Sequence, residues 1–323
     1  RVWRRQRVLL LVGAASASML VGRGLVGPAG LLQRCLSRPV ASSRAPPAAS
    51  AATNAADPLA LASSLGFVMP SATTIEYAAD YRPPVALSCG LLMVPHGQTP
   101  SNVGLLFQNH TDGGPKQRLT PAGEAMAQRG AEAFVKDFGP ILAAQLGAWK
   151  LYRSPLSRTA ATAAPYVTAL REAGVDVEEP IVDPRLIEIN QGSWHGHTVE
   201  GLASAGREAD SAAAAEYRGG SFTAAPLDGS GESLLQMLAR VSAWLRELES
   251  EHGGRGHNVL VFGHGTFQNA VEVLLRVYPD KVPAQVFSRV SGGSHLRRGE
   301  AHVLSAVRQV GASGIDDTAM ATQ

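Results

Sequence analysis

The chain has 323 residues, of which 45% are hydrophobic and 17% are charged, as in folded globular proteins and unlike disordered ones. Its net charge of +2 is uneven: residues 1–56 hold eight of the 29 basic residues and none of the 27 acidic ones, which leaves 21 basic against 27 acidic residues, or −6, for residues 57–323. The basic excess therefore gives no support for nucleic-acid binding by the later part of the chain. With only Cys35 and Cys89, a disulfide framework is excluded and no Cys/His spacing indicates zinc.

Residues 1–64 resemble a targeting segment in composition. Four arginines within residues 1–7 precede an uncharged run over 8–22, which has the length of a signal-peptide core rather than of a membrane span. The stretch that follows is rich in Ala, Ser, Pro and Arg, as in organelle transit peptides. We expect a largely disordered leader that directs the chain to a plastid or mitochondrion and is then removed. The alternative is a membrane anchor retained through residues 8–22.

Apolar runs alternate with amphipathic stretches in the rest of the chain. The expected strands are 87–94, 150–153, 177–182, 259–262, 286–290 and 302–308. The expected helices are 119–147 with a break or kink at Pro140, 157–173, 199–217, 233–252 and 266–278. Alternation of this kind predicts a three-layer α/β/α sandwich around a mainly parallel sheet. The predicted organisation is one domain over 85–310, preceded by a linker over 65–84 and followed by a disordered tail over 311–323.

Two of the expected strands run into the same dipeptide. His96 and Gly97 follow the first strand, through Pro95, and His264 and Gly265 follow the strand 259–262. Ligands of open parallel sheets bind at the carboxyl ends of the strands, so both imidazoles are expected at one site. A neutral imidazole can attack phosphorus and an adjacent imidazolium can stabilise the transferring group, while the glycines leave room for a substrate.

Arg158 and Glu188 could complete such a site. Arg158 lies at the start of an expected helix, where both the helix N-terminus and a forked guanidinium favour an anion. Glu188 precedes a glycine- and histidine-rich loop over 190–197 and could protonate a leaving alkoxide. Taken singly, each residue also fits an ordinary solvated position on a helix or loop.

Seven segments, in this order along the chain, carry a resemblance to a known family. They are residues 95–102, 107–112, 119–123, 154–159, 186–198, 231–233 and 259–265. Together they resemble the histidine phosphatase superfamily, also called the phosphoglycerate mutase-like family, over about residues 91–307. The resemblance implies the sandwich fold and phosphoryl transfer through a phosphohistidine. It implies no metal and no organic cofactor.

The resemblance also implies a role for individual residues. His96 matches the histidine that becomes phosphorylated, His264 the second histidine of the pocket, and Glu188 the proton donor. The residues expected to bind phosphate or substrate are Arg158, Asn102, Gly97, Thr99 and Gly265.

The chain departs from the family pattern at Pro95, where the motif has arginine, and at His195, where a glutamate is common. A charged hydrogen bond contributes about 1.5–3 kcal/mol, so losing that arginine predicts a rate or affinity lower by about one to two powers of ten. Lys116, Arg118 or Arg153 could partly restore the positive field. Proline at the end of a strand leaves the fold intact.

The predicted function is hydrolysis of phosphomonoesters, with a phosphorylated small molecule or a phosphoprotein as substrate and with activity weakened at Pro95. The alternative is a catalytically impaired member that binds a phosphorylated ligand or a protein partner. A phosphoglycerate-type mutase is less favoured, because residues 190–198 contain no counterpart of the mutases' longer insertion. No nucleic-acid partner is expected, and a membrane is expected only if the leader is retained.

Overall fold

The computed structural model describes residues 57–278 except 109 and 113, together with residues 282, 286–287, 296–307, 309–311 and 314–316. The first 56 residues of the expected leader, including residues 8–22, lie outside the described residues, as do residues 317–323 of the expected tail. Within the described part, no helix is long and apolar enough to cross a membrane.

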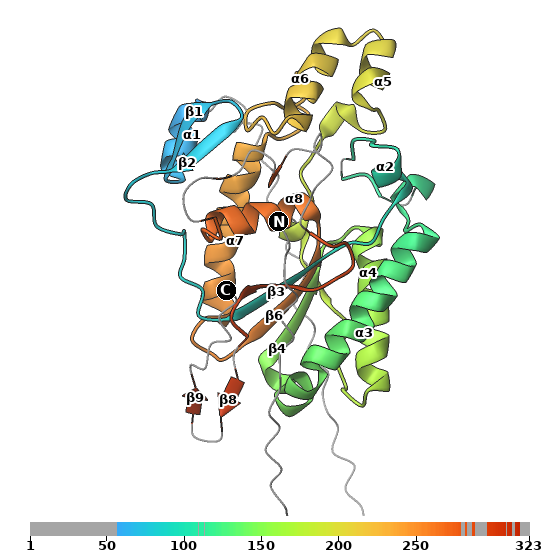
Figure 1. Ribbon diagram of the computed structural model, residues 1–323, viewed down its shortest axis with the longest axis vertical. Coiled ribbons are helices and arrows are strands. Elements are labelled where there is room, and N and C mark those ends of the chain that lie inside the picture. The colour runs from blue at the N-terminus through green and yellow to red at the C-terminus, as the bar shows by residue number, and fades with distance from the viewer. Residues whose placement is uncertain are drawn as a thin grey trace, which may run out of the picture. The chain divides into compact units, whose positions relative to one another are not determined.

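A five-stranded sheet forms the centre of the fold (Figure 1). Its strands, in spatial order, are β5 (Ile181–Val182), β4 (Trp149–Arg153), β6 (Asn258–Gly263), β3 (Gly90–Pro95) and β7 (His302–Ser305). The first four run parallel, and β7 pairs antiparallel with β3. The prediction of a mainly parallel sheet is therefore confirmed.

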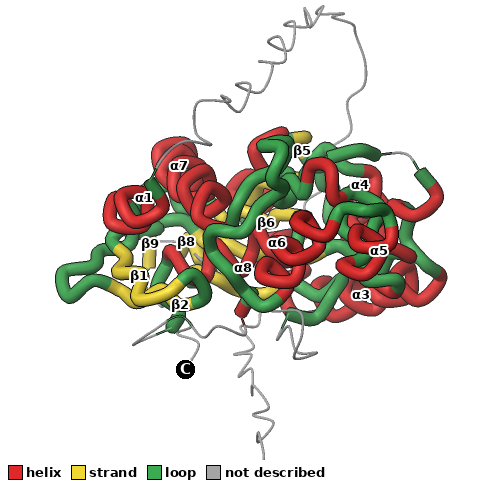
Figure 2. Tube along the Cα trace, turned by 90° about the horizontal axis from the view of Figure 1, so that it is seen from above, coloured by secondary structure: helices red, strands yellow, loops and turns green. Residues whose placement is uncertain are grey.

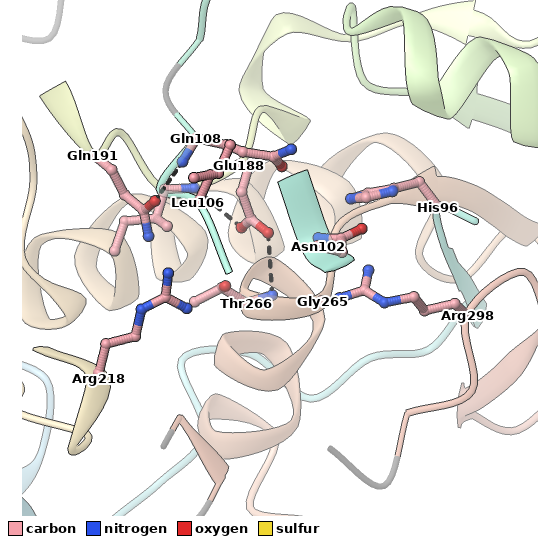
Figure 3. Close-up of a pocket in the computed structure, with 11 residues that line it drawn as sticks. His96, Asn102, Leu106, Gln108, Glu188, Gln191, Arg218, Gly265, Thr266 and Arg298 are labelled. Carbon is pink, nitrogen blue, oxygen red and sulfur yellow. Dashed lines mark hydrogen bonds between the residues drawn. The ribbon is translucent and has the colours of Figure 1, made fainter. Parts of the chain in front are cut away.

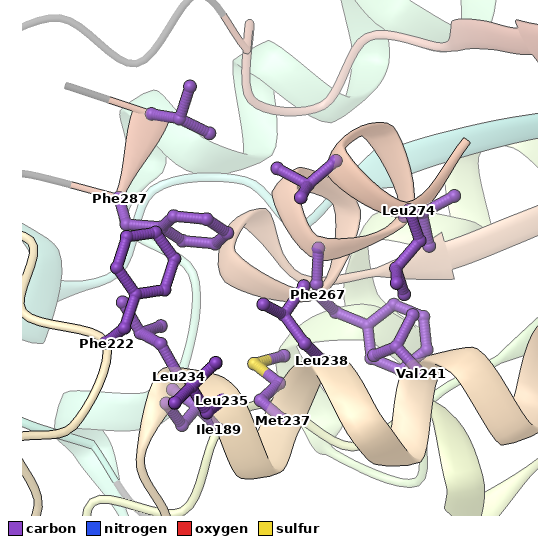
Figure 4. Packing of buried hydrophobic residues seen from close by; sticks show 14 of the residues in the cluster. Ile189, Phe222, Leu234, Leu235, Met237, Leu238, Val241, Phe267, Leu274 and Phe287 are labelled. Carbon is purple, nitrogen blue, oxygen red and sulfur yellow. The ribbon is translucent and has the colours of Figure 1, made fainter. Parts of the chain in front are cut away.

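Helices cover both faces of the sheet, which makes the three predicted layers. Leu92 and Val94 of β3 pack on α3 (Pro121–Ala144) and α4 (Ser157–Glu172). The alternate residues Leu91 and Met93 face the other way, toward the core that includes α7 (Leu234–His252) and α8 (Gly265–Leu274). Figure 2 shows the sheet between α7 on one side and α3 and α4 on the other, and Figure 4 shows the packing of α7 against α8. Successive side chains of a strand point to opposite faces, so an apolar strand holds both layers.

The remaining elements are short. The helices are α1 (Pro58–Ser64), α2 (Pro100–Val103), α5 (Val199–Ser204) and α6 (Glu208–Arg218); the 3₁₀ turns are η2 (Pro115–Gln117), η3 (Leu146–Ala148), η4 (Pro184–Leu186) and η5 (Gly192–Trp194); the outer strands are β1 (Phe67–Ser71), β2 (Thr74–Tyr77), β8 (Gln309–Gly311) and β9 (Gly314–Asp316).

Three helix predictions need correction. Of the break or kink expected at Pro140, the break is wrong, because α3 continues through this residue to Ala144; the kink stays a prediction. The single helix expected over 199–217 is two helices, α5 and α6, with Gly206 between them at φ +73°, a conformation that glycine adopts without steric cost. The last expected helix ends at Leu274 because Arg276 has φ +57°.

The strand predictions were too long where side chains bind the backbone. Of the strand expected over 177–182, only Ile181 and Val182 pair with a neighbouring strand. The Val177 carbonyl instead accepts two hydrogen bonds from the Arg171 guanidinium, at 2.9 Å and 3.2 Å. Ser88 donates its N–H to Glu249 rather than to a neighbouring strand, so β3 begins only at Gly90. Residues 286–287 form a turn, and the rest of the strand expected over 286–290 lies outside the described residues.

The expected leader end and linker, residues 58–84, also need correction. Helix α1 and the antiparallel pair β1–β2 occupy this segment. The rings of Phe67, Tyr77 and Tyr81 form a buried cluster, and the two tyrosines donate to the carbonyls of Val273 and Leu274 in α8 at 2.8 Å and 2.7 Å. The segment therefore belongs to the folded core. In the expected tail, β9 pairs with β8 rather than lying in disorder.

Candidate active site

The two motif histidines meet because their strands are adjacent. Strands β3 and β6 are parallel and in register, with Pro95 opposite Gly263, so the residues that follow them leave the sheet side by side. The ring centroids of His96 and His264 are 5.3 Å apart at 69° to one another, and both side chains are buried. The sequence prediction that these histidines share a site matches the geometry.

Hydrogen bonds orient each imidazole. Nδ1 of His96 lies 2.7 Å from the carbonyl of Gly97. Because a carbonyl only accepts, Nδ1 carries the proton, and Nε2 keeps its lone pair whenever the ring is neutral. Nε2 of His264 lies 2.8 Å from the Ser154 hydroxyl. Burial, followed by the charges of Arg158 and His96, holds the pKa of His264 well below its usual range, so this ring is neutral at pH 7.

Arg158 is the most unusual charged group of the site. Its side chain is 0% exposed, yet Nε, Nη1 and Nη2 have no hydrogen-bond partner among the residues that the structure describes. Burial lowers its pKa to about 10, against the opposing influence of Glu188 and Asp112. Buried hydrogen-bond donors without acceptors destabilise the folded protein. An oxyanion bound to this guanidinium would supply the acceptors that it lacks among the described residues.

The N-terminus of α4, by contrast, is already occupied. The Asp112 carboxylate accepts from the Ser157 N–H and hydroxyl, both at 2.6 Å. This helix N-terminus, which was expected from the sequence to help bind an anionic ligand, therefore already binds the Asp112 carboxylate. What remains for a ligand is the Arg158 side chain.

The Glu188 carboxylate lies against the N-terminus of α8. Its carboxylate accepts N–H groups from Thr266 at 3.3 Å, Phe267 at 3.2 Å and Ile189 at 3.0 Å, and it lines a pocket together with His96 (Figure 3). The helix N-terminus holds the carboxylate in place by these donors and by its dipole. Glu188 and His96 therefore face the same space, as expected for a proton donor and a nucleophile.

The other predicted binding residues differ in what they contact. Asn102 and Gly265 line the pocket; Oδ1 of Asn102 accepts from Thr99, which leaves its Nδ2 to donate to a ligand. Thr99 is buried as the N-cap of α2. Gly97 gives its N–H to Thr162, and a Cβ there would lie 2.4 Å from the Gly123 carbonyl. The small size of Gly97 thus admits α3, whereas Gly265 faces open space.

The pocket contains residues that the sequence did not single out. Arg218 and Arg298 approach it from opposite sides (Figure 3). Arg218 ends α6, donates to the Leu105 carbonyl at 2.6 Å and stacks on Phe107 with its Cζ 4.2 Å from the ring centroid. Gln108 and Gln191 join them, linked by a 2.7 Å hydrogen bond from the Gln108 N–H to the Gln191 side chain. Gln108 and Gln191 lie within the motif segments 107–112 and 186–198 but were given no role there. No motif marks Arg218 or Arg298, because segments far apart in the sequence bring them to the pocket.

Arg158 and His264 are buried and are not among the residues that line the pocket of His96. Lys116, Arg118 and Arg153, the cations expected to offset Pro95, do not line this pocket either; Nη1 of Arg153 donates to the Ser154 carbonyl. His195 is close enough to Arg158 and Lys116 for their charges to add to burial in lowering its pKa.

Comparison with protein families gives a match to the histidine phosphatase superfamily (branch 1) over residues 91–283, more than half of the chain. Comparison with curated proteins gave no significant match. Among solved structures, a mycobacterial glucosyl-3-phosphoglycerate phosphatase complexed with VO3 is 25% identical over 59% of this chain and 83% of its own, with a TM-score of 0.44.

Two other similar structures are the YhfR protein of Bacillus stearothermophilus, at 21% identity over 72% of this chain and 96% of its own with a TM-score of 0.49, and a phosphoserine phosphatase of Entamoeba histolytica, at 22% identity over 58% and 80% with a TM-score of 0.42. All three TM-scores lie below 0.5, so the assignment rests on the family match and the motifs. The chain belongs to branch 1 of the histidine phosphatase superfamily.

Proposed function

We propose that the protein hydrolyses phosphomonoesters through a phosphohistidine on His96. The observation that carries this proposal is the buried Arg158 guanidinium, which has no hydrogen-bond partner among the described residues and whose charge acts on His264, one of a pair of histidines 5.3 Å apart. A phosphoryl group supplies the acceptors that this guanidinium lacks, and Arg is well suited to bind it through two parallel N–H bonds.

The proposed reaction has two steps. Nε2 of His96 attacks phosphorus, an N–P bond forms and the ester P–O bond breaks, while the leaving oxygen takes a proton from Glu188. Water then attacks the phosphohistidine, the N–P bond breaks, and the carboxylate of Glu188 takes up the water's proton. His264, Arg158 and Asn102 stabilise the charge of the transferring group by donating hydrogen bonds.

Pro95 lowers the expected rate unless another cation of the pocket replaces the missing charge. Proline supplies no charge where the family motif has arginine. Loss of one charged hydrogen bond corresponds to a rate or affinity lower by about one to two powers of ten. The proline is otherwise accommodated, since it is the last residue of β3 and its carbonyl accepts the Gly299 N–H at 2.7 Å.

Pro95 also favours a second candidate, a catalytically impaired member that binds a phosphorylated ligand or protein without turning it over. The presence of His96, Glu188, Arg158 and His264 favours the hydrolase. A mutase is less favoured, because residues 190–198 form only the short turn η5 and its flanks. The substrate, a phosphorylated small molecule or a phosphoprotein, and an organelle destination after removal of the leader are likewise proposals.

Trapping of the intermediate tests the proposal. The protein is mixed with para-nitrophenyl phosphate, quenched within milliseconds in alkali, which preserves phosphohistidine, and analysed by peptide mass spectrometry. We expect phosphate on His96 in the wild type and none in His96→Asn.

His257→Asn is the matched control, since His257 precedes β6 at the end of the strand opposite to His264, and it should be labelled like the wild type. A wild-type protein that binds inorganic phosphate but never becomes labelled would replace the hydrolase with the binding protein.

A further inference from the structure

Arg298 is a pocket cation whose position is fixed by the fold. It belongs to the turn before β7 and lines the pocket with His96, Asn102 and Gly265. Figure 3 shows that Arg298 enters from the same side as His96, whereas Arg218 enters from the opposite side. The Arg298 side chain is thus placed on the nucleophile's side of the pocket.

The residue after Arg298 attaches the turn to three elements of the core. The Gly299 N–H donates to the carbonyl of Pro95 at 2.7 Å, and the Gly299 carbonyl accepts from the Tyr166 hydroxyl of α4 at 2.6 Å. Gly299 has φ +76°, and a Cβ there would lie 2.8–2.9 Å from backbone atoms of Met126 and Ala127 in α3. Only glycine fits this contact.

The packing is equally close from the α3 side. A Cβ at Gly130 would lie 1.7 Å from the Gly299 carbonyl oxygen, so two glycines bring the helix and the turn together. The consequence is that the backbone of residue 298 has a fixed distance from the end of β3, where residue 95 lies. The turn links Arg298 directly to the motif position that lacks its arginine.

The other arginines of the region do not reach the pocket on the side of His96. Arg153 donates to the Ser154 carbonyl and does not line the pocket, and Arg218 is held on Phe107 across the pocket. Arg297, next to Arg298, is 77% exposed and paired with Glu300. Among the described residues, Arg298 is the arginine that reaches the pocket on the side of His96.

We propose that Arg298 binds the phosphoryl group together with Arg158 and supplies, from the turn before β7, the positive charge that Pro95 does not. This inference rests on the proposed function in that both place the phosphoryl group at His96. A phosphate dianion then meets one buried and one half-buried guanidinium, each able to donate two hydrogen bonds. The charge of the site is restored although the motif position is a proline.

The test compares Arg298→Gln with Arg298→Lys and with the control Arg297→Gln. Binding of orthovanadate and inorganic phosphate is measured by calorimetry, and hydrolysis of para-nitrophenyl phosphate by steady-state kinetics. Arg298→Gln is expected to weaken anion binding and to lower kcat/KM by about ten- to a hundredfold, the range for loss of a charged hydrogen bond. Arg298→Lys should recover part of this, and Arg297→Gln should stay within about twofold of wild type.

A double variant distinguishes replacement of the motif arginine from general electrostatics. Pro95→Arg should rescue Arg298→Gln by at least tenfold but improve the wild type only slightly, because the wild-type site is already charged. If Arg298→Gln binds orthovanadate as tightly as Arg297→Gln, the inference is wrong. If anion binding depends on Arg298 but no phosphohistidine forms, the inference holds and the hydrolase proposal fails. If the wild type binds neither anion, both fail.

Discussion

Arg158 and His264 are both buried, and the charge of Arg158 disfavours a positive charge on His264. Burial lowers the pKa of both groups, and the charge of Arg158 is the next contribution at His264. The His264 imidazole is therefore neutral in the absence of a ligand, and of these two groups only the Arg158 guanidinium is charged. A bound phosphate dianion reverses this balance, because its negative charge favours protonation of His264.

A second buried histidine, His252, makes stability depend on pH. Its side chain is 6% exposed, and burial, followed by the charges of His257, Lys150, Arg255 and Arg185, lowers its pKa to about 4. Above pH 6.5 the residue is neutral in both the folded and the unfolded chain. As the pH falls below 6.5, the unfolded chain takes up a proton that the folded protein does not, so the free energy of unfolding decreases.

The expected decrease from His252 between pH 7.5 and pH 5.0 is on the order of 2 kcal/mol, at about 1.4 kcal/mol per pKa unit. Urea unfolding of the wild type and of His252→Gln at both pH values measures it. The variant should lose less stability on acidification than the wild type. Equal losses in His252→Gln and the wild type would show that His252 is protonated in the folded state.

At the scale of elements, the segment that precedes β3 is part of the core. Phe67, Ile75, Tyr77 and Tyr81 are all buried, and burial of each large apolar side chain contributes about 1.5–3 kcal/mol. The two tyrosine hydroxyls that donate to α8 add about 1 kcal/mol each. A chain that begins at residue 85 should consequently be less stable than one that begins at residue 57 by at least about 4 kcal/mol.

Urea unfolding of these two chains measures the difference in their free energies of unfolding. Tyr81→Phe, which removes a single hydrogen bond to the Leu274 carbonyl, serves as the reference and should lower the free energy of unfolding by about 1 kcal/mol. Equal stability of the two chains would contradict the structure and support a domain boundary at residue 85, as the sequence suggested.

The elements that the sequence predicted best are those decided by local apolar runs. Strands β3, β4 and β6 and helices α4 and α7 lie within a few residues of their predicted positions. The failures come from side chains that act at a distance. Arg171 donates a hydrogen bond to the Val177 carbonyl, which is then not available for pairing in the expected strand 177–182. Tyr77 of β2 and Tyr81 of the following loop donate to carbonyls almost 200 residues away in the sequence.

At the scale of the whole molecule, the pocket joins residues from 96 to 298 at the carboxyl ends of two parallel strands. His96, His264, Glu188 and Arg158 could be found from the sequence, because each lies in a motif at the end of an element. Arg218 and Arg298 could not, because the surfaces that orient them, the Phe107 ring and the turn at Gly299, exist only after folding. Gly97 was assigned to substrate binding, yet it makes room for α3.

The buried arginine of the anion site also lowers the stability of the whole protein. A pKa of about 10 for Arg158, against 12.5 for a solvated arginine, corresponds to a cost on the order of 3 kcal/mol at about 1.4 kcal/mol per pKa unit. Sites built for binding often reduce stability in this way. Removal of the charge leaves Glu188 with its three N–H donors and Asp112 with Ser157, so the neighbours keep their partners.

The central claim is that Arg158 is kept buried, without a hydrogen-bond partner among the residues that the structure describes, in order to bind phosphate. The most direct test is to measure stability and anion binding together in Arg158→Met. Arg153→Met, at a half-buried arginine that does not line the pocket, is the control. We expect Arg158→Met to raise the free energy of unfolding by up to about 3 kcal/mol and to abolish orthovanadate binding, with neither effect in the control. A variant that loses stability while it binds orthovanadate as tightly as the wild type would contradict it.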